Sequence, residues 1–231
     1  MNVDSAVQPS MQSLKTITSP TGVVYPEPPW FTEGYSFAAS YRVPIESVAL
    51  PDGLQAVGIG GWTFGMLMFV RYEPPSPLLY NELVWIPAKV RSTTNPKMGG
   101  YYVAHMSVDD RSSLAAGREI WGLGKTWGDF HVDGESIEAS LEHGTKIRLR
   151  AKGYGPAFPA KARMSTLQVR GDEGICFTGE FTSKVSLAKL EVLELESTDP
   201  AWESFKVAKR MPAPAIAMPR FKATMTPPLV F

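Results

Sequence analysis

A lysine inside a glycine-rich stretch is the first candidate for chemistry in this chain. Residues 117–128 read GREIWGLGKTWG, and the tripeptide Gly124-Lys125-Thr126 matches the end of a nucleotide-binding loop. Such a loop needs a glycine five positions before Gly124, where this chain has Glu119, whose carboxylate would repel phosphates. The preceding DDRSSLAAG also fits a helix, whereas a phosphate-binding loop follows a buried strand. The phosphate-binding interpretation is therefore rejected, and by default Lys125 is a solvated loop lysine.

The other side chains capable of chemistry have structural explanations. His105, His131 and His143 are far apart, and no HxH, HExxH or CxxC spacing predicts a metal site. Cys176 is the single cysteine, so no intrachain disulfide can form, and its apolar neighbours place it in the core. His105 alone remains of interest, because it lies on a predicted strand that leads into the helix before Lys125.

The elements that must position these residues are mostly strands. The best helix candidate spans residues 110–122, with Asp110 as its cap and a glycine at its end. Shorter helices are predicted at 44–50 and 200–208, and a hairpin is predicted to turn at His143-Gly144. Period-two patterns and turn residues predict strands at 35–43, 56–73, 78–90, 99–109, 137–155, 164–171, 174–182 and 185–197. We therefore expect one mostly antiparallel, barrel-like β domain with a few short helices.

Composition limits the classes of partner. Apolar residues make up 44% of the chain, enough for a sizeable core, while 23 basic and 23 acidic residues leave no net charge to attract nucleic acid or anionic lipid. No apolar run reaches the ~20 residues that span a bilayer, and the N-terminus lacks the apolar core of a signal peptide. We predict a flexible segment at 1–20 and a single domain at 21–231, in a soluble cytoplasmic protein without nucleic-acid or membrane partners.

Four stretches of the chain resemble the acetoacetate decarboxylase family over about residues 25–225. They are PPW, YRVPIESVALPDGL, the triplet Tyr80-Asn81-Glu82, and YYVAHMSVDDRSSLAAGREIWGLGK. The last is the most specific, because the spacing from GRE to Lys125 matches the spacing to the family's reactive lysine. The Tyr-x-Glu triplet places the family's active-site glutamate at Glu82.

The resemblance implies a fold, an activity and roles for residues. The fold is a closed, cone-shaped antiparallel β-barrel around an apolar pocket, assembled into a homo-oligomer. The activity is a lyase reaction on a small keto acid or related carbonyl compound, through a Schiff base on Lys125 with Glu82 as proton shuttle and no added cofactor. Arg118 and Glu119 hold the helix and the lysine loop. Around Lys125 we expect the pocket to include Phe64, Met66, His105, Trp121 and Leu123.

The chain departs from the family pattern at three positions. Gly124 precedes the lysine where proline is usual, Thr126 follows it where acetoacetate decarboxylases have a second lysine, and Gly34 aligns with an arginine that attracts the substrate's carboxylate. An attacking amine must be neutral, whereas free lysine has a pKa of ~10.4 and is almost entirely protonated at neutral pH. Without a neighbouring cation at position 126, we expect burial alone to favour the neutral form of Lys125.

These departures leave alternatives open. Aldol condensation, dehydration or retro-aldol cleavage of a larger carbonyl compound uses the same imine without a carboxylate anchor. The lysine can also act as a general base or hydrogen-bond donor in an enzyme of secondary metabolism. Finally, the strands can form a pocket that binds a small molecule without catalysis.

Overall fold

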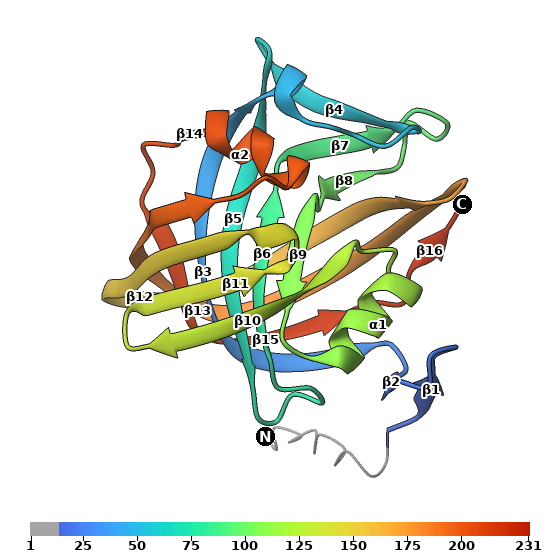
Figure 1. Cartoon of the computed structure of the whole chain (residues 1–231), viewed down its shortest axis with the longest axis horizontal. Helices are drawn as coiled ribbons and strands as arrows, with labels where there is room; N and C mark the ends of the chain where they lie inside the picture. Colours follow the sequence, from blue (N-terminus) through green and yellow to red (C-terminus); the bar gives the residue numbers. More distant parts are fainter. Residues whose placement is uncertain (1–13) are drawn as a thin grey trace, which may run out of the picture.

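The computed structural model describes residues 14–231, and strands dominate it (Figure 1). The helical segments are α1 (Arg111–Glu119) and α2 (Glu203–Val207), with single 3-10 turns at Ile45–Ser47, Glu142–Gly144 and Pro200–Trp202. The strands are β1 (Thr16–Thr18), β2 (Val24–Pro26), β3 (Trp30–Pro44), β4 (Leu54–Ile59), β5 (Trp62–Glu73), β6 (Asn81–Ile86), β7 (Ala88–Ser92), β8 (Gly99–Tyr102), β9 (His105–Val108), β10 (Lys125–Asp133), β11 (Ser136–Leu141), β12 (Lys146–Arg170), β13 (Glu173–Glu196), β14 (Lys209–Arg210), β15 (Ala215–Met225) and β16 (Leu229–Val230).

One large sheet carries nearly all the strands. β1 and β2 pair only with each other, and the large sheet runs in the order β11-β10-β9-β6-β5-β4-β7-β8-β12-β13-β15-β3-β14. β11 also pairs with β12, and β5 also pairs with β3. The prediction of a mainly β protein with few short helices is confirmed, while the closed cone stays a prediction.

The pairing of β9 with β10 is an exception within the mostly antiparallel sheet. These strands run parallel, with Lys125 opposite Met106. Helix α1 connects them, and a parallel pair requires such a crossover because the chain must return to the same end of the sheet. The crossover brings α1 beside the first residue of β10 (Figure 1).

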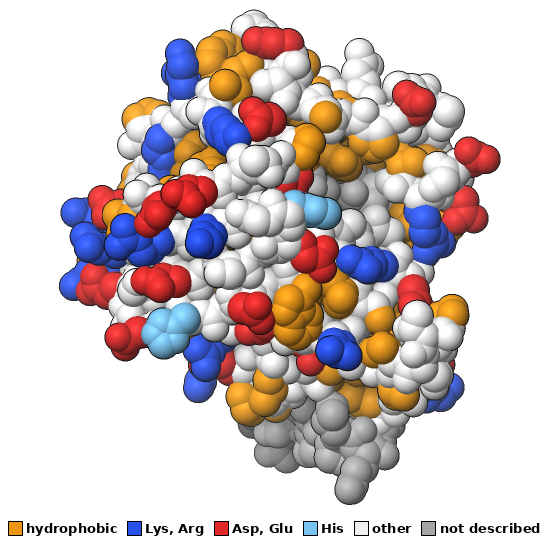
Figure 2. Space-filling view, in the orientation of Figure 1, with side chains coloured by type: hydrophobic (Ala, Val, Ile, Leu, Met, Phe, Trp, Pro, Cys, Tyr) orange, Lys and Arg blue, Asp and Glu red, His pale blue; other side chains and the backbone are white. Residues whose placement is uncertain are grey.

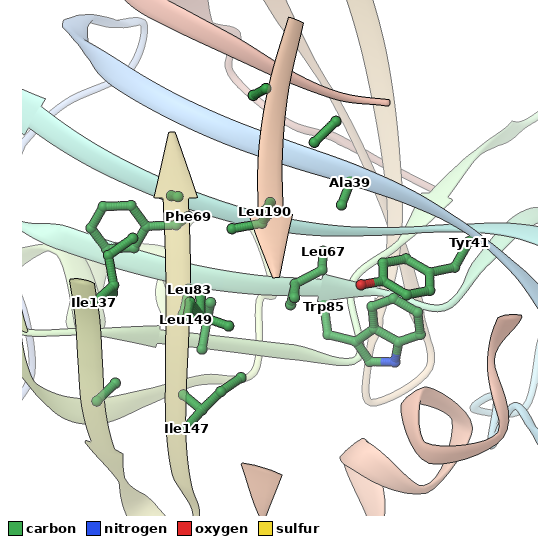
Figure 3. Close-up of a cluster of buried hydrophobic side chains, with 14 of the residues drawn as sticks. Ala39, Tyr41, Leu67, Phe69, Leu83, Trp85, Ile137, Ile147, Leu149 and Leu190 are labelled. Carbon is green, nitrogen blue, oxygen red and sulfur yellow. The ribbon is translucent and has the colours of Figure 1, made fainter. Parts of the chain in front are cut away.

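Alternation along the strands assigns most of the buried side chains to two large clusters, beside a smaller third one around Leu54, Ala88, Val90 and Leu167. In β6, Leu83 and Trp85 belong to the first cluster, which Figure 3 shows with side chains from β3, β5, β11, β12 and β13. Val84 and Ile86 point the other way into the second cluster, which includes Trp121 of the loop after α1. Successive strand residues face opposite sides of a sheet, so one strand serves both clusters. The second cluster contains the cavity described below.

Local predictions had mixed outcomes. The helix at 110–122 is confirmed as α1, and Asp110 caps it by accepting a hydrogen bond from the Ser113 amide. The hairpin turn at His143-Gly144 and the helical segment near 200–208 are also confirmed. The helix expected at 44–50 is wrong, because only one 3-10 turn forms before Val48 becomes extended.

The N-terminal prediction also needs a correction. Residues 1–13 of the predicted flexible segment lie outside the described residues, but Thr16–Thr18 forms β1 and pairs with β2. None of the helices in the described part is long and apolar enough to cross a membrane. On the face seen in Figure 2, acidic and basic side chains are interspersed.

Candidate active site

Lys125 is buried and its amine is held by two polar side chains. Only 4% of the residue is exposed. Its Nζ donates to Oε2 of Glu82 at 2.9 Å and to Oγ of Ser113 at 2.8 Å. The ring centroid of Tyr80 lies 5.3 Å from Nζ, a distance at which an aromatic face stabilises a cation. Sequence spacing alone would have left this lysine on a surface loop, whereas the structure places it inside beside Glu82.

The crossover between β9 and β10 brings these groups together. Asp110 caps α1 through the amide of Ser113, which fixes the hydroxyl that accepts from Lys125. The side chain of Asp109 accepts hydrogen bonds from both the backbone and the amide of Asn81, the residue before Glu82. Two neighbouring aspartates therefore hold the two elements that carry the hydrogen-bond partners of the amine.

Gly117 leaves the space through which the lysine side chain passes. A Cβ built at Gly117 would lie 2.5 Å from Cδ and 2.6 Å from Cε of Lys125. A glycine inside a helix costs up to ~1 kcal/mol relative to alanine, so this glycine has a packing role. The glycine of the GRE sequence is thus explained by the position of the amine.

Gly117→Ala is expected to impair the site without unfolding the protein. The new methyl group must displace the lysine stem, which breaks one or both contacts of Nζ, while alanine raises helix propensity by up to ~1 kcal/mol. We expect covalent labelling of Lys125 by a ketone and borohydride to fall at least about ten-fold, since the reacting atoms are misplaced. Gly124→Ala is the matched control, because a Cβ there meets nothing within 4 Å. Equal labelling in both variants would contradict this role.

Arg118 and Glu119 contact the loop and the N-terminal strands, and not the amine. Nε of Arg118 donates to the backbone carbonyl of Lys125 at 2.7 Å. The carboxylate of Glu119 accepts from the hydroxyl of Tyr25. These contacts agree with the expectation that both residues hold α1 and the lysine loop in place.

Two buried tyrosines extend the polar group around Glu82. The hydroxyl of Tyr72 donates to Oε1 of Glu82 at 3.2 Å, and the rings of Tyr72 and Tyr80 lie 4.4 Å apart. Burial raises the pKa of Tyr72 well above its ordinary value, and the nearby carboxylate of Glu82 raises it further. Burial, followed by Tyr72 and Glu82, does the same to the pKa of Tyr80. Both phenols therefore keep their protons at neutral pH.

An apolar cavity with about 90 Å³ of free space opens beside Lys125. Its wall is rich in methionine and aromatic side chains, and Trp121 donates its indole N–H to the carbonyl of Thr226, which fixes the ring. The lining residues are Trp30, Thr32, Ser36, Met68, Val70, Tyr72, Tyr80, Glu82, Val84, Ile86, Val103, Met106, Trp121, Leu123, Lys125, Met164, Thr166, Phe177, Phe181, Met218, Phe221 and Met225.

Trp121 and Leu123 line the cavity as expected, but three other expected pocket residues do not. Phe64 and Met66 lie on the same side of β5 as Met68, but further along the strand. Met66 packs at the edge of the second cluster, and Phe64 contacts the ring of Tyr101. The prediction that Phe64 and Met66 line the pocket was wrong. Their shared face of β5 could be read from the sequence, but the length of strand that the cavity covers could not.

His105 faces the opposite side of β9. Its Nε2 shares a hydrogen bond with Oγ of Ser107 at 2.8 Å, and its Nδ1 lies 3.6 Å from a carboxylate oxygen of Asp199. Its ring packs on Trp202 with centroids 4.7 Å apart. The next residue, Met106, reaches the cavity instead. The pocket assignment of His105 was therefore wrong by one strand position, which reverses the face.

Thr126 also points away from the cavity. Its hydroxyl lies 2.7 Å from Oγ of Ser107 on the side of His105. The residue after Lys125 on β10 must face away from Lys125, so a cation at this position of this chain would not lie in the cavity. Across residues 14–231, no three His, Cys, Asp or Glu side chains gather closely enough to form a metal site.

Comparisons with known proteins identify the family. The family model described as acetoacetate decarboxylase matches residues 16–169. The chain belongs to the acetoacetate decarboxylase family. No curated protein is similar enough to the chain to count as a match.

Solved structures with the same fold include enzymes of this family. The acetoacetate decarboxylase from Legionella pneumophila is 14% identical, with a TM-score of 0.61. The match covers 100% of this chain and 98% of that one. The enduracididine biosynthesis enzyme MppR in complex with pyruvate is 13% identical, with a TM-score of 0.59 and coverage of 92% and 94%. An acetoacetate decarboxylase-like enzyme from Sphingomonas wittichii RW1 is 14% identical, with a TM-score of 0.55 and coverage of 89% and 94%. At these identities the likeness shows the fold alone.

From the sequence we did not identify several residues of the site. Ser113 and Tyr72 contact the Lys125–Glu82 pair, and Thr32 and Ser36 line the cavity. Gly117 had a usable signal, since a glycine within a helical pattern suggests close packing. The others carry no signal in one sequence, because serine, threonine and tyrosine on strands or helices are common without function.

Proposed function

We propose that this member of the acetoacetate decarboxylase family is a lyase that acts on a small carbonyl compound through a Schiff base on Lys125. One observation carries the proposal: a buried amine lies at the wall of an apolar cavity, with a carboxylate 2.9 Å away to exchange its proton. Transferring the proton from Nζ to Glu82 turns a buried ion pair into two neutral groups, which removes the cost of keeping charges out of water. The neutral amine is then the nucleophile.

The steps use only these two side chains and water. The nitrogen of Lys125 adds to the carbonyl carbon, and protonated Glu82 donates to the departing hydroxyl as water leaves. The positively charged imine accepts the electron pair of the carbon–carbon bond that breaks, giving an enamine. In a retro-aldol cleavage Glu82 accepts the hydroxyl proton as the second fragment leaves as an aldehyde; in a decarboxylation, which releases CO2, Glu82 takes its proton from water. Glu82 then gives this proton to the enamine carbon, and hydrolysis releases the product. The hydroxyl of Tyr72 holds the other oxygen of Glu82 throughout.

We also propose that the large sheet closes into the cone-shaped barrel implied by the family. The pairing of β11 with both β10 and β12, and of β5 with both β3 and β6, supports closure. Closure shields the cavity from water on its strand side, which strengthens electrostatic interactions inside.

Trapping tests the proposed chemistry directly. The purified protein is incubated with a methyl ketone and sodium borohydride, which reduces an imine to a stable secondary amine, and the labelled peptide is mapped by mass spectrometry. We expect the adduct on Lys125 and not on exposed lysines such as Lys152 or Lys222, whose side chains are 60% and 68% exposed. Labelling spread over exposed lysines, without Lys125, would refute the Schiff base.

A further inference from the structure

Two buried hydroxyls in the cavity wall have no partner within the described protein. Thr32 and Ser36 lie on β3 and are 4% and 1% exposed. Among residues 14–231, neither Oγ1 of Thr32 nor Oγ of Ser36 makes a hydrogen bond. A buried hydroxyl without a partner costs about 1–3 kcal/mol, so two of them in one wall call for an explanation.

The strand register places these hydroxyls on the same wall of the cavity as Glu82, two strands away. Ser36 lies opposite Val70 on β5, and Val70 lies opposite Glu82 on β6. The three residues form one row on the same face, so the backbones of Ser36 and Glu82 are separated by two strand spacings, about 10 Å. Thr32 follows on the same face of β3. A molecule bound to Lys125 thus has room to extend from Glu82 toward this pair.

The charge of the cavity wall limits what such a molecule can carry. Among the described lining residues, Lys125 is the one cation, and it is paired with Glu82. Gly34, between Thr32 and Ser36, cannot be replaced by a charged side chain, because its Cβ would lie 2.0 Å from the backbone oxygen of Arg71. A substrate carboxylate would therefore share the single positive charge of Lys125, as the amine or as the protonated imine, with the carboxylate of Glu82, which leaves a net negative charge buried in the wall and is strongly unfavourable.

We infer that Thr32 and Ser36 form a neutral polar subsite that hydrogen-bonds to an uncharged oxygen of an otherwise apolar ketone or aldehyde. The substrate class is a hydroxy ketone or diketone and not a free keto acid. The inference rests on the proposed function, since it places the carbonyl carbon at Lys125. It favours cleavage or condensation of the aldol type, because in these reactions the bond that breaks or forms joins the carbon next to the carbonyl to a hydroxyl-bearing carbon, and no carboxylate is needed.

The test compares three methyl ketones of similar size: 5-hydroxy-2-pentanone, 2-hexanone and levulinate, which end in a hydroxyl, a methyl group and a carboxylate. Binding is measured by quenching of tryptophan fluorescence, because Trp30 and Trp121 line the cavity, and trapping at Lys125 is measured separately. We expect the wild type to bind the hydroxy ketone roughly ten-fold more tightly than 2-hexanone, the value of about one net hydrogen bond, and levulinate most weakly.

The double variant Thr32→Val/Ser36→Ala is expected to remove this preference while 2-hexanone binds as before. Both substitutions delete unpartnered hydroxyls and keep the shape of the wall, so the fold is expected to persist. Ser40→Ala is the control, as Ser40 lies on the same strand outside the cavity and is expected to keep the preference. An unchanged preference in the double variant, or tightest binding of levulinate by the wild type, overturns the inference. Loss of trapping with the binding preference intact refutes only the Schiff base.

Discussion

Lys125→Met is expected to abolish the borohydride adduct and every reaction that passes through the imine. Methionine fills nearly the same volume but has no nucleophile, so labelling falls to the background of exposed lysines. The substitution also leaves the carboxylate of Glu82 buried beside the cavity without its partner at 2.9 Å. Removing one member of a buried pair typically costs about 3–5 kcal/mol, which urea unfolding of the variant will measure.

A second substitution separates the loss of chemistry from the loss of stability. In Lys125→Met/Glu82→Gln the unpaired charge is gone, and we expect most of the lost free energy of unfolding to return. Labelling is expected to stay at background in the double variant. Activity that survives in either folded variant would show that the site works without an amine, as a hydrogen-bonding pocket or a binding protein would.

Glu82→Gln is expected to separate formation of the imine from its turnover. The amide keeps the shape of the side chain but cannot carry a proton. Lys125 keeps its hydrogen bond to Ser113 at the cavity wall, so we expect the adduct on Lys125 still to form. Exchange of the α-hydrogens of a methyl ketone in D₂O requires interconversion of imine and enamine, and therefore a proton shuttle. We expect exchange, followed by nuclear magnetic resonance, to slow by about 10²–10⁴-fold.

Tyr72→Phe provides the matched control for the carboxylate. It removes the hydrogen bond to Oε1 of Glu82 at 3.2 Å but leaves the proton shuttle in place. A smaller loss of exchange is expected, in line with the value of a single hydrogen bond. If Glu82→Gln and Tyr72→Phe slowed exchange equally, Glu82 would be a positioning residue and another group would move the proton.

The orientation of Thr126 changes how this site must favour a neutral amine. From the sequence we compared Thr126 with the second lysine of acetoacetate decarboxylases and inferred that a positive charge is missing beside Lys125. In the structure the side chain at this position faces Ser107 and the first core cluster. The immediate surroundings of Nζ are instead Glu82, Ser113 and the ring of Tyr80. Proton transfer within the pair with Glu82 therefore takes the place of repulsion by a second cation in the proposed mechanism.

The sequence by itself determined the local features of this protein. Alternation and turn residues were sufficient to predict a mainly β chain, and an aspartate before an apolar stretch was sufficient to predict the cap of α1. Such features depend on neighbours within a few residues. The spacing between GRE and Lys125, together with Glu82, indicated the family and the pair that the structure brings together.

Only the tertiary structure decided what surrounds that pair. Whether His105 or Met106 reaches the cavity depends on the register of β9 against β6, and one residue of slip reverses the faces. Thr32 and Ser36 belong to the site because β3 lies next to β5, far from Lys125 in the sequence. Gly117 has its role because the chain turns back after α1 and places the side chain of Lys125 against the helix at this glycine. A cavity is assembled from rows of residues on different strands, so its lining follows from the pairing of strands and not from any one segment.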